Sequence, residues 1–283
     1  MPNNLGLSEQ LLYSTARIEC TLANGTSTGT GFFFSFDVDD GPLKIPVVVT
    51  NKHVIENSVT GRILFNVADS EGNPVDTEHY PIALDNFESR WFLHPEPEVD
   101  LCVMPIGPYV NYASHHGEKL FYRTLGKQYI PSFEQLNELG VMEEITMVGY
   151  PSGLWDAVNN KPIVRRGITA THPKLNYNGV EEFLIDAACY PGSSGSPVMI
   201  VNEGSFTNRA GFQMGVNRIF LLGILYAGPQ FTATGQIRMQ NIPNRPVSVS
   251  HIPMNLGNVI KAHKLLDFEE MLIQLYKSSP QQN

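Results

Sequence analysis

The chain has 283 residues, 42% of them hydrophobic, and a formal net charge of −9 from 28 acidic and 19 basic residues. This length and apolar content suffice for one large or two small packed domains, and the acidic balance argues against a nucleic-acid partner. No apolar run of about 18 residues occurs, so the sequence predicts no membrane span and no membrane partner.

The three cysteines, Cys20, Cys102 and Cys189, lie far apart in apolar runs. An odd number at such spacing predicts buried free thiols. The first six residues, Met-Pro-Asn-Asn-Leu-Gly, have neither the basic start nor the apolar core of a signal peptide. These two features together lead us to expect a protein of the reducing cytoplasm.

The first part of the chain is typical of short strands separated by turns. Apolar or alternating runs predict strands at residues 13–22, 30–36, 45–50, 61–67, 79–84 and 101–106. Turn-forming residues such as Asn24 and Gly25 stand between them. This pattern favours an all-β barrel or sandwich.

Residues 107–142 interrupt the strand pattern. They include Gly107, Pro108 and a helix candidate at residues 132–139, which Gly140 would end. We interpret this region as the connection between two β domains.

Strands return in the second half, where they are predicted at residues 144–150, 162–171, 182–189, 196–201 and 214–227. Residues 228–246 are rich in Pro, Gly, Asn, Gln and Thr and predict a long loop. From Asn255 to Leu275 the apolar residues recur at near-helical spacing, which predicts an amphipathic C-terminal helix.

Residues 190–197, Tyr-Pro-Gly-Ser-Ser-Gly-Ser-Pro, form a turn between two apolar runs, with Ser194 near its centre. Such a turn would hold the serine on an exposed bend. A serine is a weak nucleophile unless a base takes its proton, and the flanking glycines let the backbone approach a substrate closely. Taken alone, the motif is equally typical of a flexible surface loop.

Two further residues would be suitable partners for that serine. His53 follows the third strand in the segment Thr-Asn-Lys-His-Val, and Asp100 opens another strand in the segment Val-Asp-Leu-Cys-Val. The order His, Asp, Ser and these local contexts resemble the trypsin-like (chymotrypsin-fold) serine peptidases, most closely their HtrA/Deg-like branch. Similar segments at residues 29–32, 148–153, 186–188 and 252–255 extend the resemblance to roughly residues 14–275.

The resemblance implies an all-β fold of two six-stranded antiparallel β-barrels with a C-terminal α-helix. Residues 1–128 would form the N-terminal barrel and carry His53 and Asp100. Residues 129–142 would connect the barrels, and residues 143–283 would form the second barrel with Ser194 and the helix.

The resemblance also implies a serine endopeptidase that hydrolyses polypeptides through an acyl-enzyme. Ser194 would attack the peptide carbonyl, His53 would act as general base and then acid, and Asp100 would hold the imidazole in one tautomer. The backbone amides of Gly192 and Ser194 would bind the oxyanion. No cofactor or metal is implied, and the histidine pair at residues 115–116 has no Cys, Asp or Glu at ligand spacing apart from Glu118, so it is not interpreted as a metal site.

Two positions depart from the digestive members of the family. Ser193 stands where those enzymes carry an Asp that pairs with a cleaved N-terminus, so activation by cleavage is not expected. Ala188 stands where trypsin-type specificity uses Asp, and Leu225, Tyr226 and Ala227 are expected to supply other pocket walls. We therefore expect a small or medium apolar residue at P1 rather than Lys or Arg.

HtrA-type proteins usually carry a PDZ domain after the peptidase, and we expect none here because the sequence ends at its helix. Control of the site would then fall to the loop at residues 228–246 or to a regulatory protein partner. Two alternatives stay open. One is a latent or inactive trypsin-like fold that serves as a binding or scaffold module, and the other is a non-peptidase acyl hydrolase.

Overall fold

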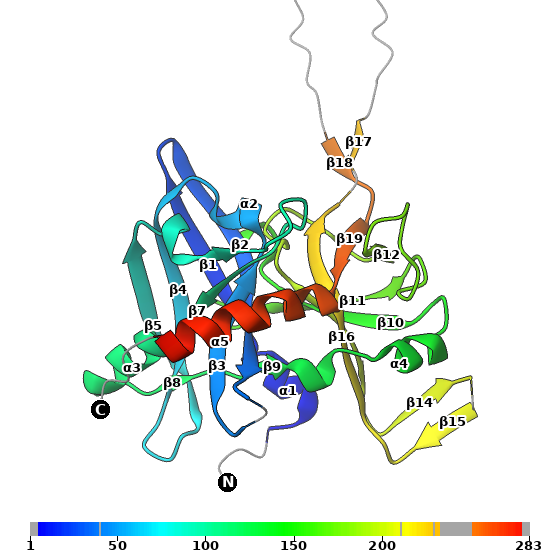
Figure 1. Cartoon of the computed structure of the whole chain (residues 1–283), viewed down its shortest axis with the longest axis horizontal. Helices are drawn as coiled ribbons and strands as arrows, with labels where there is room; N and C mark the ends of the chain where they lie inside the picture. The colour runs from blue at the N-terminus through cyan, green and yellow to red at the C-terminus, as the bar shows by residue number, and fades with distance from the viewer. Residues whose placement is uncertain (1–4, 40, 210, 229, 233–250, 279–283) are drawn as a thin grey trace, which may run out of the picture.

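A computed structural model describes residues 5–39, 41–209, 211–228, 230–232 and 251–278. β structure predominates and forms two assemblies, one from each half of the sequence (Figure 1). A helical segment at the C-terminal end packs against both assemblies.

A nine-stranded sheet forms the N-terminal half. Its main order is β5-β4-β1-β2-β3-β7-β6, while β8 pairs with β4 and β9 pairs with β2. The strands of this sheet are β1 (Thr15–Leu22), β2 (Gly25–Asp37), β3 (Lys44–Thr50), β4 (Ser58–Ala68), β5 (Pro74–Asp85), β6 (Phe92–Leu93), β7 (Cys102–Pro105), β8 (Leu120–Phe121) and β9 (Leu125–Gly126).

The first half does not close into the predicted six-stranded barrel. Within the described ranges, β5 pairs only with β4, and β6 pairs only with β7, so no ladder joins the two edges of the sheet. Because β6 has two residues, it offers too few backbone groups to continue the ladder around to β5. The N-terminal half is therefore an open sheet.

The second half contains a closed six-stranded antiparallel barrel, as predicted. Its order is β10-β11-β12-β19-β16-β13. The strands of the barrel are β10 (Glu144–Gly149), β11 (Ile163–Thr169), β12 (Glu182–Asp186), β13 (Pro197–Asn202), β16 (Arg218–Ala227) and β19 (Leu256–Lys261).

Two hairpins and several short helices complete the described structure. The hairpin strands are β14 (Ser205–Asn208) with β15 (Gly211–Met214), and β17 (Gln230–Thr232) with β18 (His251–Pro253). The α-helices are α1 (Leu7–Leu11), α2 (Lys52–Ile55), α3 (Gly107–His115), α4 (Phe133–Glu138) and α5 (Glu269–Ser278). The 3-10 helices are η1 (Glu88–Arg90), η2 (Lys127–Tyr129), η3 (Pro151–Gly153) and η4 (Ala262–Phe268).

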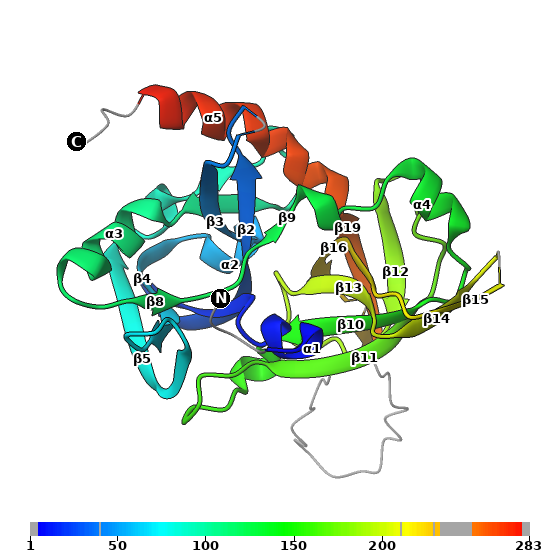
Figure 2. The same ribbon diagram turned by 90° about the horizontal axis from the view of Figure 1, so that it is seen from below.

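The C-terminal segment begins as a strand and only then becomes helical. The predicted C-terminal helix is present as η4 and α5, but its predicted start at Asn255 is wrong. Residues 256–261 instead form β19, which closes the barrel by pairing with β12 and β16. Figure 2 shows η4 and α5 running from the barrel across the N-terminal sheet near β3.

One hydrophobic core is shared by the two halves. It combines Phe32 and Phe34 of β2 with Leu221 and Ile260 of the barrel and with Phe268 of η4. Phe33 belongs to a second core inside the N-terminal sheet, because successive side chains of a strand point to opposite faces. The shared core therefore joins the N-terminal sheet to the barrel.

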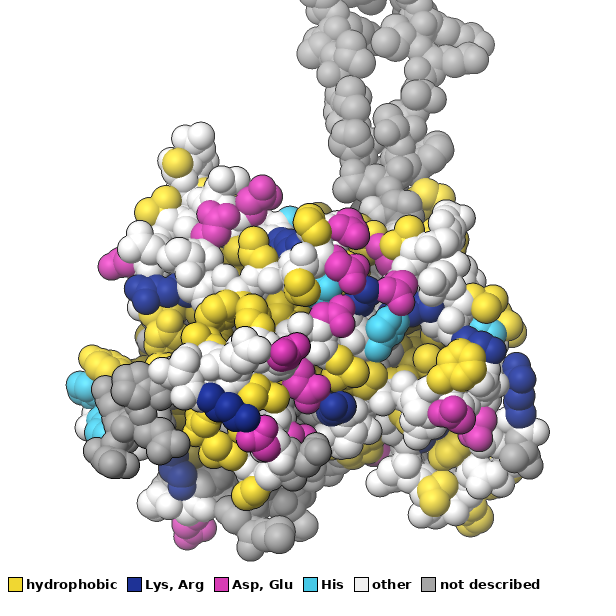
Figure 3. All heavy atoms as spheres, viewed as in Figure 1, with side chains coloured by type: hydrophobic (Ala, Val, Ile, Leu, Met, Phe, Trp, Pro, Cys, Tyr) yellow, Lys and Arg dark blue, Asp and Glu magenta, His cyan; other side chains and the backbone are white. Residues whose placement is uncertain are grey.

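Two predictions about composition can be compared with the structure. All three cysteines are buried and free, which confirms the prediction of unpaired thiols. Among the described residues, no helix is long and apolar enough to cross a membrane. On the face shown in Figure 3, lysine and arginine side chains are scattered among acidic ones rather than gathered in a continuous stripe.

Candidate active site

His53 and Asp100 meet because the strands beside them are neighbours in the sheet. β3 ends at Thr50, which pairs with Cys102 at the start of β7. His53 lies in α2 just after β3, and Asp100 lies just before β7. The His53 Nδ1 to Asp100 Oδ2 distance is 2.5 Å, and the His53 backbone N–H donates to Asp100 Oδ1 at 3.2 Å.

A buried asparagine fixes the backbone at the carboxylate. Asn51 is fully buried, and its Nδ2 donates to the Asp100 carbonyl oxygen at 2.7 Å. Asp100 is therefore held through both its backbone and its side chain. The imidazole of His53 stays 45% exposed.

Ser194 lies in the turn between β12 and β13, as the sequence predicts. Its Oγ donates to the Tyr226 carbonyl oxygen at 3.3 Å, and its own carbonyl accepts from the Thr30 N–H at 3.0 Å. Within the described part of the chain, no hydrogen bond joins Ser194 to His53. The structure therefore brings the predicted base and carboxylate into contact but leaves the serine hydroxyl turned towards β16.

Gly195 brings the serine turn close to the strands that lead to His53. Its φ is +86°, and a Cβ added there would collide with the Thr30 carbonyl and lie 2.6 Å from the Thr50 Oγ1. Only glycine accommodates both this conformation and this close approach. The serine turn thus lies against the middle of β2 and the end of β3, three residues before His53.

The backbone just before Ser194 is also fixed. Gly192 has a φ of +81°, and its carbonyl accepts from the Thr30 Oγ1 at 2.9 Å. The Ser152 N–H donates to the Pro191 carbonyl at 2.5 Å. Among the described residues, the amides of Gly192 and Ser194 donate to no protein acceptor.

Residues 29–206, which contain all three predicted catalytic positions, match the family of trypsin-like peptidase domains. The chain belongs to the trypsin-like peptidase family. No curated protein sequence matches the chain.

Solved structures of peptidases resemble the chain over most of its length. The HtrA-type protease AlgW with a tripeptide is 17% identical, with a TM-score of 0.45, and the match covers 94% of this chain and 62% of that chain. A serine endoprotease from Yersinia pestis is 15% identical, with a TM-score of 0.45 and coverages of 93% and 64%. The inactive form of the Rv3671c protease is 14% identical, with a TM-score of 0.41 and coverages of 91% and 88%. The chain thus spans less than two thirds of the length of the first two.

The residues predicted to line the substrate pocket of this member of the trypsin-like peptidase family lie in different surroundings. Leu225 is 2% exposed, and its side chain belongs to the barrel core, while its carbonyl accepts from the Gly195 N–H at 2.8 Å. Tyr226 donates its hydroxyl to Glu182 Oε1 at 2.8 Å, and Ala227 is exposed. The Ala188 carbonyl accepts from Arg165 Nη1 at 2.6 Å. The assignment of these residues to a substrate pocket stays a prediction.

The loop predicted at residues 228–246 lies mostly outside the described residues. Only residue 228 and residues 230–232 of it are described, the latter as β17.

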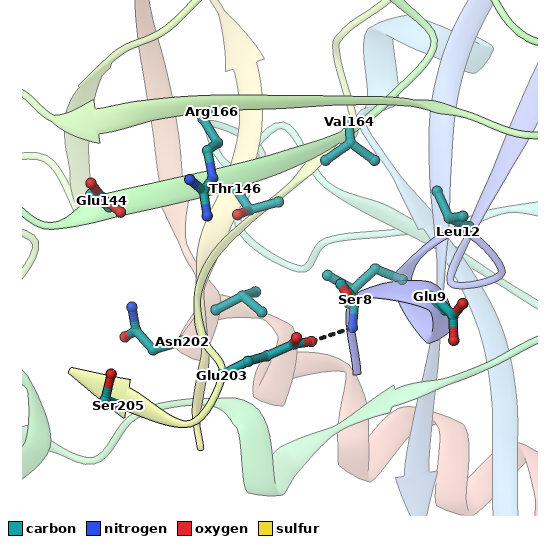
Figure 4. A pocket seen from close by; sticks show the side chains of 12 residues that line it. Ser8, Glu9, Leu12, Glu144, Thr146, Val164, Arg166, Asn202, Glu203 and Ser205 are labelled. Atoms are coloured by element: carbon teal, nitrogen blue, oxygen red, sulfur yellow. Dashed lines mark hydrogen bonds between the residues drawn. The ribbon is translucent and has the colours of Figure 1, made fainter. Parts of the chain in front are cut away.

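A large cavity of the molecule is separate from this site. Its volume is about 610 Å³. Figure 4 shows it between α1, β10 and β11, with Arg166 and Glu203 among its lining residues. None of the predicted catalytic or pocket residues lines it.

Two residues that position the site were not singled out from the sequence. Asn51 and Thr30 both lie in segments quoted for the family resemblance, but nothing in one sequence marks their contacts. Their partners, Asp100 and Gly192, are 49 and 162 residues away in the chain. A third residue, Arg165, contacts Ser193 from β11.

Proposed function

We propose that the chain is a serine endopeptidase in which Ser194, His53 and Asp100 hydrolyse peptide bonds through an acyl-enzyme. The observation that carries the proposal is the 2.5 Å contact between His53 Nδ1 and Asp100 Oδ2 beside a serine turn with two unoccupied amides. Membership of the trypsin-like peptidase family supports it, because the matched residues include all three positions.

In the proposed reaction Asp100 accepts a hydrogen bond from the Nδ1–H of His53. The other ring nitrogen is then free to take the proton of Ser194 Oγ as that oxygen attacks the peptide carbonyl. The carbonyl oxygen becomes an oxyanion and accepts from the amides of Gly192 and Ser194. His53 gives its proton to the leaving amine, and water then hydrolyses the acyl-enzyme by the same steps.

One movement is needed before attack. In this structure the Ser194 hydroxyl donates to the Tyr226 carbonyl at 3.3 Å. Rotation about the side-chain bond of Ser194 would turn the hydroxyl from β16 towards His53. Such a rotation carries the side chain of the half-buried Ser194 from one staggered position to another.

The decisive experiment is labelling with a fluorophosphonate, which reacts with an activated serine. We expect the folded wild-type chain to be labelled, and the Ser194→Ala and His53→Ala variants to stay unlabelled. Hydrolysis of a denatured polypeptide by the wild type alone would then show endopeptidase activity. Cleavage of small esters without any cleavage of polypeptide would instead favour an acyl hydrolase.

A second candidate function is a latent or inactive fold that acts as a binding module. The hydrogen bond from Ser194 to Tyr226, in place of one to His53, is the observation that favours it. A folded wild-type protein that resists labelling would support this second candidate. Binding of a regulatory protein would then be sought as the condition that turns the hydroxyl.

A further inference from the structure

Arg165 reaches the serine turn from the interior face of the barrel. It lies in β11, where neighbouring side chains alternate between the two faces of the strand. Arg165 is half-buried, whereas Val164 and Arg166 on either side of it are exposed. Figure 4 shows Val164 and Arg166 pointing from β11 into the cavity described above, on the opposite face of the strand.

One nitrogen of Arg165 binds both ends of the segment before Ser194. Nη1 donates to the Ala188 carbonyl oxygen at 2.6 Å and to the Ser193 Oγ at 2.8 Å. Ser193 is 1% exposed, so this contact is shielded from solvent. The segment that the two contacts enclose contains Gly192, one of the two proposed oxyanion donors. A planar guanidinium is well suited to fixing two acceptors at once.

The guanidinium of Arg165 has no counter-ion among the described residues. No carboxylate forms an ion pair with it, and its Nε and Nη2 are buried without a hydrogen-bond partner in that part of the chain. Burial lowers the pKa of Arg165. A buried charge of this kind is costly, and a negative charge that develops nearby would compensate it.

We infer that Arg165 is a positioning residue that clamps residues 188–193, so that the amides of Gly192 and Ser194 converge on the oxyanion. The inference rests on the proposed function. The clamp comes from β11 of the same chain and forms when the barrel folds.

The test compares two arginines that are adjacent in the chain but lie on opposite faces of β11. Arg165→Met removes the charge and the donors, Arg165→Lys keeps a charge and donors but loses the planar guanidinium, and Arg166→Met is the matched control. We expect fluorophosphonate labelling to slow by about ten- to a hundredfold in Arg165→Met, less than the loss expected from removing an oxyanion donor outright. Arg165→Lys should be intermediate, and Arg166→Met should label at the wild-type rate.

Hydrogen exchange provides a readout that does not depend on activity. Loss of the clamp should speed exchange in residues 188–195 of Arg165→Met and leave β13 and β2 as protected as in Arg166→Met. Equal exchange in residues 188–195 of all variants would overturn the inference. Faster exchange throughout the chain would also overturn it, because Arg165 would then support the whole barrel rather than one segment. If the wild type does not label at all, the proposed function fails, and this exchange comparison still decides whether the clamp exists.

Chemical rescue provides a second, independent test. In Arg165→Ala, millimolar guanidinium should restore part of the labelling rate and then saturate, because the ion fills the space left by the side chain. Sodium at the same ionic strength should not do so, and the labelling rate of Arg166→Ala should not respond to guanidinium. The positioning role would be contradicted if added guanidinium left the labelling rate of Arg165→Ala unchanged and hydrogen exchange in residues 188–195 were also unchanged.

Discussion

Thr30 joins the two halves of the molecule at the site. Its buried hydroxyl accepts from the Tyr150 N–H at 3.0 Å and donates to the Gly192 carbonyl at 2.9 Å. Its carbonyl accepts from the Thr50 Oγ1 at 2.7 Å, and its N–H donates to the Ser194 carbonyl at 3.0 Å. A single residue of β2 therefore contacts the strand that leads to His53, the turn after β10 and the serine turn.

Replacing that hydroxyl should destabilise the protein and disturb the serine turn. Thr30→Val keeps the shape of the side chain but leaves the Tyr150 N–H and the Gly192 carbonyl without their partner. We expect the free energy of unfolding to fall by about 1–3 kcal/mol and labelling to slow. Thr30→Ser, which retains the hydroxyl, is the control and should stay close to the wild type. Urea unfolding and fluorophosphonate labelling measure the two effects, and equal behaviour of the Val and Ser variants would contradict the role of the hydroxyl.

The environment of Ala188 predicts which P1 residues are disfavoured. Ala188 carries no carboxylate, and its carbonyl already accepts from the cationic Arg165. A P1 Lys or Arg would therefore bring a second positive charge towards this place without a counter-ion. For peptides that differ only at P1, we expect kcat/KM with Leu or Val to exceed that with Arg by at least about tenfold, or about 1.4 kcal/mol of transition-state binding. Faster cleavage after Arg would show that the pocket lies elsewhere.

At the scale of elements, the loop that carries Asp100 is anchored to η4. Lys264 of η4 is 7% exposed, and its Nζ lies 2.9 Å from Glu96 Oε1 and 2.6 Å from Glu181 Oε2. The Glu96 carbonyl also accepts from Lys52 Nζ, next to His53, at 3.0 Å. The C-terminal segment therefore ties the loop of the predicted carboxylate to the residue just before β12 of the barrel.

Removing Lys264 should lower the free energy of unfolding at neutral pH and make it depend less on acidification. The hydrogen bond from Lys264 lowers the pKa of the Glu181 carboxyl. A lowered folded-state pKa adds stability above the unfolded value of about 4.3, and this stability is lost as the pH falls through the lower folded value. Lys264→Met should therefore lower the free energy of unfolding at pH 7 by about 1–2 kcal/mol, a modest amount because both carboxylates are partly exposed. On acidification from pH 7, the free energy of unfolding of this variant should fall by less than that of the wild type.

The matched control is the exposed pair of Lys277 and Asp39, whose Nζ to Oδ1 distance is 2.8 Å. Lys277→Met should change the free energy of unfolding by less than about 0.5 kcal/mol, because exposed ion pairs contribute little. Urea unfolding of both variants between about pH 7 and pH 3 measures the difference. Equal losses in the two variants would show that the anchor at η4 does not stabilise the fold.

The sequence predicted elements well where local pattern decides them, and less well where distant pairing decides them. The strands around His53, Asp100 and Ser194 are present where the alternation and turn residues indicated. The apolar residues after Asn255 fit a helix by spacing, but Val259 and Ile260 are buried by pairing with β12 and β16. Local periodicity cannot reveal such non-local pairing. The same limit explains why the open edge of the N-terminal sheet was not foreseen.

The candidate active site shows the same difference between residues that local pattern reveals and residues that act through distant contacts. The three predicted catalytic residues lie in recognisable local segments, so one sequence was enough to propose them. Arg165 and Thr30 act through contacts with Ser193 and Gly192 across the barrel and between the halves. Those contacts depend on register and burial, which a single sequence does not specify.

At the scale of the whole molecule, the shared core argues that the two halves unfold together. Phe268 is fully buried in it and packs edge-on against His94, with ring centroids 5.2 Å apart. Phe36 of β2 and Met199 of β13 belong to the same cluster. The predicted boundaries at residues 128 and 143 therefore describe the order of the segments along the chain. They do not by themselves make the two halves energetically independent.

We predict one cooperative transition for both halves. Phe268→Ala should lower the free energy of unfolding by about 3–5 kcal/mol, because it opens a large cavity in the shared core. Native-state hydrogen exchange should then show β2 and β12 losing protection by the same amount, as expected for two-state unfolding.

Phe87→Ala is the sharper control, since Phe87 lies in the core of the N-terminal sheet alone. It should still lower protection in β12, because the N-terminal sheet cannot unfold without removing half of the shared core from the barrel. If Phe87→Ala lowers protection in β2 and leaves β12 unchanged, the halves are independent domains.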